Sequence, residues 1–308
     1  MTDTNLSNAT DAPRLPRATE SATLLTPRQM LRRRAIGHWG LMIGGVLLAA
    51  IVLIAVFGPM LMHISPYAQD LTARLMPPVW AGGSWDHVFG TDHLGRDYLA
   101  RILIGARISL TVGFLAATLG CVIGVSLGLA AGYFGGRVDQ VVSYLLTCQL
   151  SLPELLLAMV LVFLIGPSLW VVIGVIGILH WTYYLVIARS AAMRIRELDF
   201  VAAARALGSP TWRVLGYEIL PNLRSQVIVI FTIEMGTAIL SEAALSFLGV
   251  GIQSPTPAWG LMIAQGRETL FFDPWLCILP GAALFILIMA VNLFGDGLRD
   301  VLTPEGRR

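Results

Sequence analysis

Six long apolar runs divide the sequence, separated by more polar stretches. They cover residues 39–62, 108–134, 141–165, 169–187, 227–250 and 275–295. Each is close to the ~20 residues that a helix needs to cross the hydrocarbon core of a bilayer. Trp39, Trp170 and Trp275 stand at the beginnings of three runs, where the indole ring favours the membrane–water interface. The pattern predicts an all-α membrane protein with six transmembrane helices.

The arginines predict how these helices are oriented. If the N-terminus is cytoplasmic, sixteen arginines fall in cytoplasmic segments and five in extracytoplasmic ones. Because positive residues concentrate on the cytoplasmic side of membrane proteins, we expect both termini there. Two segments between the spans are then large enough to carry function, an outer one at 63–106 and a cytoplasmic one at 188–224.

The same pattern predicts the organisation of the chain. Residues 1–35 are polar without apolar periodicity and are expected to form a disordered cytoplasmic tail. Residues 36–104 would hold the first span, which is too long for a signal-peptide core, and the outer segment with an amphipathic helix. Residues 105–300 would form a core of five spans with a cytoplasmic loop at 189–224. Residues 301–308 would form a short cytoplasmic tail.

The composition supports this class and removes several kinds of chemistry. Of the 308 residues, 56% are hydrophobic and only 13% are charged, and the mean hydropathy is +0.74. All 21 basic residues are arginine. A P-loop and a Schiff-base enzyme both need a lysine, so any ATP hydrolysis must come from a partner chain. The spacing of Cys121, Cys148 and Cys277 fits neither a zinc site nor a disulfide framework.

The cytoplasmic loop has the pattern of a helix–turn–helix. Near its end, the first helix has a run of three small residues, Ala202, Ala203 and Ala204, followed by Arg205. Gly208 is expected to stop it in the left-handed conformation. Ser209 would then cap a second helix with Pro210 at its first position, and this helix would run to Leu220 and end at Pro221. The small alanine side chains would allow either close approach by another protein or packing against the same bundle. The residue types alone do not distinguish these two alternatives.

Several motifs carry a resemblance to a known family. Ala203, Ala204, Gly208, Ile219, Leu220 and Pro221 resemble the cytoplasmic "EAA" loop of ABC-importer permeases, although Ala202 replaces the frequent glutamate. GTDHLGRD at 90–97, GARISL at 105–110, EAALSFLG at 242–249, PAWG at 257–260 and FGDGLRD at 294–300 are similar to the C-type permease of dipeptide, oligopeptide and nickel importers.

The resemblance implies a type I ABC importer permease fold in a bacterial cytoplasmic membrane. It implies a homologous second permease, one or two P-loop ATPase subunits that bind ATP and Mg, and an extracytoplasmic binding protein. The loop would couple to the ATPase, and this chain would hold no cofactor, metal or catalytic residue and bind no nucleic acid. Dipeptides or short oligopeptides are the expected cargo, with nickel, haem or another small solute as alternatives.

The outer segment is expected to end in an amphipathic helix that leads into the second span. Asp92, Arg96, Asp97 and Arg101 lie off or before its apolar stripe, which makes them candidates for contact with the binding protein. Thr91 or Asp92 would cap this helix. The alternatives are a purely structural interfacial helix and a metal site at Asp86, His87, Asp92 and His93, but the latter fits no recognised ligand spacing.

Polar and small residues inside the spans suggest two further features. Gly120, Gly124, Gly128 and Gly132 form a groove for close helix packing, either within the subunit or with a second permease. Glu154, Glu234 and Glu242 are candidates for lining the translocation path, because carboxylates are costly within a membrane. The same glutamates leave open a different class of protein, a stand-alone proton-coupled carrier.

Overall fold

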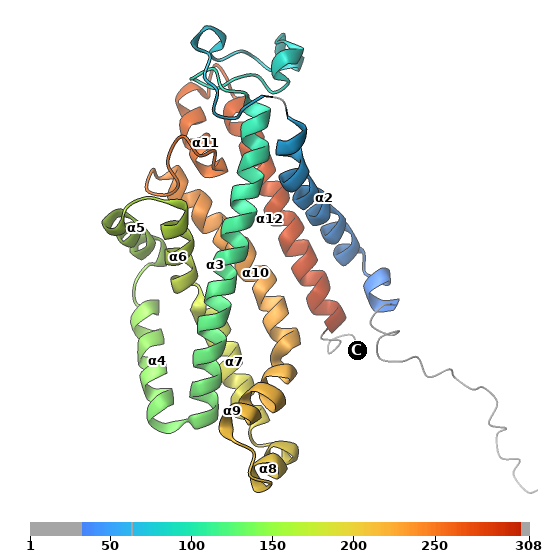
Figure 1. Ribbon diagram of the computed structural model, residues 1–308, viewed down its shortest axis with the longest axis vertical. Coiled ribbons are helices and arrows are strands. Elements are labelled where there is room, and N and C mark those ends of the chain that lie inside the picture. The colour runs from blue at the N-terminus through green and yellow to red at the C-terminus, as the bar shows by residue number, and fades with distance from the viewer. Residues whose placement is uncertain (1–32, 63, 303–308) are drawn as a thin grey trace, which may run out of the picture.

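The computed structural model describes residues 33–62 and 64–302, and these are almost entirely helical (Figure 1). The expected tails at 1–35 and 301–308 fall largely outside the described residues. The helices are α2 (Trp39–Leu61), α3 (Tyr98–Phe134), α4 (Gly136–Leu150), α5 (Glu154–Ile165), α6 (Leu169–Leu179), α7 (Trp181–Ile195), α8 (Asp199–Ala206), α9 (Thr211–Arg213), α10 (Leu220–Phe247), α11 (Trp259–Gly266) and α12 (Trp275–Leu302). Short 3-10 turns at Leu71–Ala73, Val79–Ala81, Trp85–His87 and Arg267–Thr269 complete the loops.

Five described helices or helix pairs are long and apolar enough to cross a membrane, and the bent pair α4–α5 makes a sixth span if its two helices are counted as one. Residues 141–165, predicted as one span, form parts of two helices, because α4 and α5 meet at an angle of 88°. Pro153 lies directly before α5. Because proline has no backbone N–H, it cannot donate the hydrogen bond that would continue α4. Glu154 therefore begins a new helix instead of lying inside an old one.

The outer amphipathic helix does not exist as a separate element. Residues 94–97 are not helical, and α3 begins at Tyr98, ten residues before the predicted start of the second span. Asp97, not Thr91 or Asp92, caps α3, because its carboxylate accepts a 2.7 Å hydrogen bond from the backbone N–H of Ala100. The predicted interfacial helix and span are therefore one continuous helix of 37 residues.

The prediction that Pro221 ends a helix was also wrong. A π-helical turn at Val214–Ile219 runs directly into α10, and Pro221 lies in the first turn of α10. The N–H of Leu220 bonds to the carbonyl of Leu215, five residues back. A widened turn separates the proline ring from the preceding carbonyls, so the helical path continues from Thr211 to Phe247.

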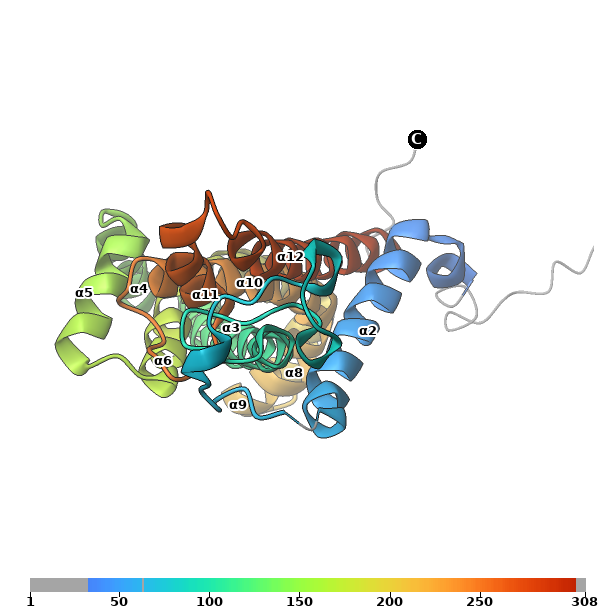
Figure 2. The ribbon, with the colours of Figure 1, turned by 90° about the horizontal axis from the view of Figure 1, so that it is seen from above.

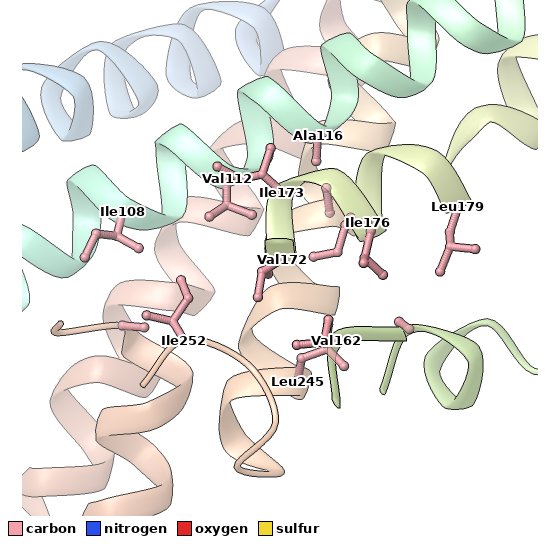
Figure 3. Packing of buried hydrophobic residues seen from close by; sticks show 14 of the residues in the cluster. Ile108, Val112, Ala116, Val162, Val172, Ile173, Ile176, Leu179, Leu245 and Ile252 are labelled. Carbon is pink, nitrogen blue, oxygen red and sulfur yellow. The ribbon is translucent and has the colours of Figure 1, made fainter. Parts of the chain in front are cut away.

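Helix α3 runs through the centre of the bundle, and α7 packs along it. A Cβ atom on Gly120, Gly124, Gly128 or Gly132 would collide with α7 or the residue before it. The glycine groove is thus filled within this subunit. Figure 3 shows side chains of α3 and α6 meeting beside Val162 of α5 and Leu245 of α10.

Helix α2 lies at the periphery, where it packs against α12 (Figure 2). Close contact depends on two glycines, since a Cβ on Gly44 would meet the backbone of Phe294 and one on Gly297 would meet Leu41. His38 Nε2 lies 3.0 Å from Asp300 Oδ2, so the start of α2 is beside the end of α12. The segment 64–97 covers one end of the bundle and α8 lies at the other (Figure 1).

Candidate functional site

The tip of the bundle at α8 is a helix–turn–helix. Gly208 has φ +79°, as expected for a left-handed helix stop. The N–H of Gly208 bonds to the carbonyl of Arg205 at 2.9 Å, and the N–H of Ser209 bonds to that of Ala204 at 3.0 Å. These two bonds form a Schellman motif, which fixes the direction in which the chain leaves α8.

The predicted start of the second helix was wrong by one residue, since α9 begins at Thr211 and not at Pro210. Pro210 occupies the cap position of α9, and its side chain and that of Ser209 make no capping hydrogen bond. The backbone of Pro210 accepts the hydrogen bonds of Arg213 and Val214 instead. A proline at this position has the extended ψ of 150° that a helix cap requires, so it can start α9 without a capping side chain.

Buried side chains hold this tip against the rest of the bundle. Val201, Val214, Ile219 and Leu223 have no exposed surface and pack in one cluster with residues of α3 and α7. Arg205 adds a cation–π contact, with its guanidinium carbon 4.8 Å from the centre of the Tyr133 ring. The tip is therefore fixed to the spans, and a force on it would reach them.

The side of the tip that faces away from the bundle exposes an apolar surface. Leu207 is 86% exposed, and the rings of Trp212 and Tyr217 are also exposed and contact each other. Ala202, Ala203, Arg205, Gly208 and Pro210 are exposed as well, whereas Ala204 and Ser209 are half-buried. Of the remaining motif residues, Ile219 is buried in the core, and Leu220 and Pro221 begin α10. Exposed aromatic and aliphatic side chains at the end of a membrane bundle mark a surface suited to protein contact.

A second cluster of ionisable groups lies where two helices are broken. His180 separates α6 from α7, and its Nδ1 is 2.8 Å from Glu234 Oε2 on α10. Its Nε2 is 2.9 Å from Glu154 Oε1 at the start of α5. Glu234 and His180 are buried, while the side chain of Glu154 is half exposed. One imidazole thus bridges two of the three glutamates singled out by the sequence.

These groups border a cavity of about 190 Å³. Glu154, His180 and Ser241 supply its polar lining, and Leu155, Ala158, Ile176 and Leu179 supply its apolar lining. Glu234 is not one of the lining residues and contacts His180 at the other ring nitrogen. His180 and Ser241 were missed in the sequence analysis, although a lone histidine within an apolar span is itself a signal of function.

The third glutamate has a different environment. Glu242 has no exposed surface, and its Oε1 accepts a 2.7 Å hydrogen bond from Ser246 Oγ. The Ser246 hydroxyl in turn accepts a 3.0 Å bond from the backbone N–H of Ile252. Glu242 therefore joins α10 to the loop after it and does not line the described cavity.

The outer residues proposed for binding-protein contact are inside the fold. Asp92, Arg96, Asp97 and Arg101 are at most 3% exposed, so the expectation that they lie on the surface was wrong. Asp92 Oδ2 is 2.7 Å from Arg96 Nε and 3.4 Å from Arg101 Nε, and Asp97 Oδ2 is 2.9 Å from His87 Nδ1. Charged groups removed from water must pair with each other, which explains their burial as a network that ties the outer segment to α3.

The residues considered for a metal site bond to other residues and do not gather around one point. Asp86 bonds to Ser84, His87 to Asp97, and Asp92 to Arg96. Burial lowers the pKa of His93, which borders a separate outer cavity. Among residues 33–62 and 64–302, no three His, Cys, Asp or Glu side chains gather as a metal site.

Comparisons with known proteins agree with the motifs. Residues 124–308 match the family described as binding-protein-dependent transport system inner membrane component, and residues 26–78 match the N-terminal TM domain of oligopeptide transport permease C. The chain is 36% identical over 296 residues to the dipeptide transport system permease protein DppC of Alkalihalophilus pseudofirmus, covering 96% of each chain. It is 38% identical to a probable D,D-dipeptide transport system permease protein of Escherichia coli, covering 84% of this chain and 86% of that protein.

The fold also resembles a solved transporter. An inward-facing structure of the MetNI methionine ABC transporter contains a chain that aligns with a TM-score of 0.53 and 18% identity. The alignment covers 65% of this chain and 96% of that chain. At this identity the likeness shows a shared fold.

Proposed function

Because the chain belongs to the family of binding-protein-dependent transport system inner membrane components, we propose that it imports dipeptides or short oligopeptides as one permease of an ABC transporter. Membership makes it a non-catalytic membrane subunit, and the ATPase of such a transporter is a separate subunit. The peptide cargo is proposed because relatives that align with this chain over most of their length are named as dipeptide permeases.

The observation that carries the proposed mechanism is the exposed apolar tip formed by α8 and the turn at Gly208. We expect this tip to sit in a groove of a P-loop ATPase on the cytoplasmic side. The residues that would form or position the contact are Ala202, Ala203, Ala204, Arg205, Gly208, Ser209, Pro210, Ile219, Leu220 and Pro221. Since the buried cluster around Val214 fixes the tip to α7 and α10, closure of the ATPases would move those helices.

The remaining parts of the proposal concern partners and orientation. A homologous permease would complete the path, one or two ATPase subunits would bind ATP and Mg, and a binding protein would dock on the outer end covered by residues 64–97. Both termini would be cytoplasmic. The buried network around Asp92 supports that outer segment from within and is not itself the proposed docking surface.

Purification of the tagged chain in mild detergent tests this function. We expect a second permease and P-loop ATPases to copurify, and we expect the complex in liposomes to import a dipeptide only with ATP and the loaded binding protein. Uptake of nickel or haem instead of peptide would contradict the cargo. Uptake by the chain alone, abolished by collapse of the pH gradient, would support the proton-coupled carrier and contradict the importer.

A further inference from the structure

The ionisable cluster beside the cavity at the start of α5 holds two acidic groups and one basic group. Glu154 and Glu234 both contact His180, so even a protonated imidazole balances only one of the two carboxylates. The lining residues include no arginine. A carboxylate without a counter-charge is costly at membrane depth, so the cluster either takes up a proton or attracts a cation.

The shape of the site favours a cation that arrives with an apolar group. The side chain of Glu154 is half exposed and borders the cavity, whereas Glu234 is buried behind His180. Leu155, Ala158, Ile176 and Leu179 form the apolar wall of a space of about 190 Å³. A polar group at a broken helix, next to an apolar wall, is the arrangement that transporters use for solutes inside the membrane.

We propose that this cavity binds the α-ammonium group of a peptide in transit, with Glu154 as the contact and the apolar wall against the first side chain. This inference rests on the proposed peptide function. His180 is a positioning residue, because it holds Glu154 from one side and is itself held by Glu234 from the other. The half-exposed position of Glu154 leaves its carboxylate accessible to the peptide.

The first test is uptake by the complete transporter in liposomes at saturating loaded binding protein. Glu154→Gln should lower the peptide uptake rate by about tenfold or more, since a hydrogen bond to a charged group is lost. Glu154→Asp keeps the charge and should retain most uptake. Glu268→Gln, the same change at an exposed outer residue, is the matched control and should transport at the wild-type rate.

The second test reports the charge of the cavity without any cargo. Leu155→Cys places a thiol on the exposed part of the lining, and peptide mapping measures its modification separately from the native cysteines. A cationic methanethiosulfonate should react faster than an anionic one. Adding Glu154→Gln should bring the ratio of the two rates close to that of a neutral site.

The two tests separate failure of the inference from failure of the proposed function. Wild-type uptake by the Glu154→Gln transporter, or a rate ratio that this change leaves unaltered, would overturn the ammonium site. If the wild-type complex imports no peptide, the proposed function and the peptide assignment fail together. The rate ratio then still decides whether the cavity attracts cations.

Discussion

Ser246 joins Glu242 to the backbone of Ile252, because its hydroxyl donates to Glu242 Oε1 at 2.7 Å and accepts from Ile252 N at 3.0 Å. All three atoms are buried at the end of α10. The short residue at 246 thus satisfies both a buried carboxylate oxygen and the backbone N–H of Ile252 in the following loop. No hydrophobic residue could replace these two bonds.

Ser246→Ala should therefore destabilise the protein by about 1–3 kcal/mol, since it leaves a buried acceptor and a buried donor unsatisfied. Denaturant titration of the detergent-solubilised protein measures this loss in the free energy of unfolding. Ser190→Ala is the matched control, because Ser190 lies on the exposed side of α7 and bonds only to its own helix. Equal stability of the two variants would contradict the structural role assigned to Ser246.

The glycine groove of α3 gives a second prediction. A Cβ on Gly124 would lie 2.6 Å from Cβ of Tyr184 and would also collide with the carbonyl oxygen of Trp181. Gly124→Ala should separate α3 from α7 and cost about 1–3 kcal/mol. Gly174→Ala is the control, since nothing lies within 4 Å of its new methyl group, and it should be neutral or slightly stabilising. Equal unfolding midpoints of Gly124→Ala and wild type would contradict the close packing.

The long apolar runs predicted where the spanning helices lie, because a membrane span requires a minimum length and an apolar composition. The runs did not give the size of the 88° bend before Glu154, since a proline removes one hydrogen bond but does not set the direction of the next helix. The same limit applies at Pro221, where a widened turn lets the helix continue. Helix continuity at a proline depends on tertiary packing.

Among the candidate sites, the sequence predicted the local feature at Gly208 but not the contacts between distant residues. Gly208 could be placed as a left-handed stop because its conformational requirement is local. The pairing of His180 with Glu154 and Glu234 joins three helices over 80 residues of sequence, so no spacing rule reveals it. The charge of Arg96 and Arg101 predicts surface positions, because charged side chains are usually exposed. Their burial depends on Asp92, whose role as a shared partner is a property of the folded segment.

The Asp92 network leads to a third prediction. Asp92→Asn would leave two fully buried guanidinium groups without their shared carboxylate, and we expect a loss of about 3–5 kcal/mol. Glu197→Gln removes an exposed pair with Arg196 and should cost less than about 1 kcal/mol. Limited proteolysis of the outer segment and denaturant unfolding should both distinguish the variants. An Asp92→Asn protein as stable as Glu197→Gln would show that the buried arginines have other partners.

The turn at Gly208 gives the prediction closest to function. Gly208 has φ +79° and open space around it, so a larger side chain meets no neighbour, but a β-branched residue strains the backbone by about 1–3 kcal/mol. Gly208→Val should therefore alter the angle between α8 and α9 and uncouple ATP hydrolysis from transport, while the subunits still assemble. Gly216→Val is the matched control, because Gly216 also has open space but no positive φ. Copurification, ATPase rate and peptide uptake are measured on the same preparations. Normal ATP-dependent uptake by the Gly208→Val complex would show that the shape of this turn does not matter for coupling.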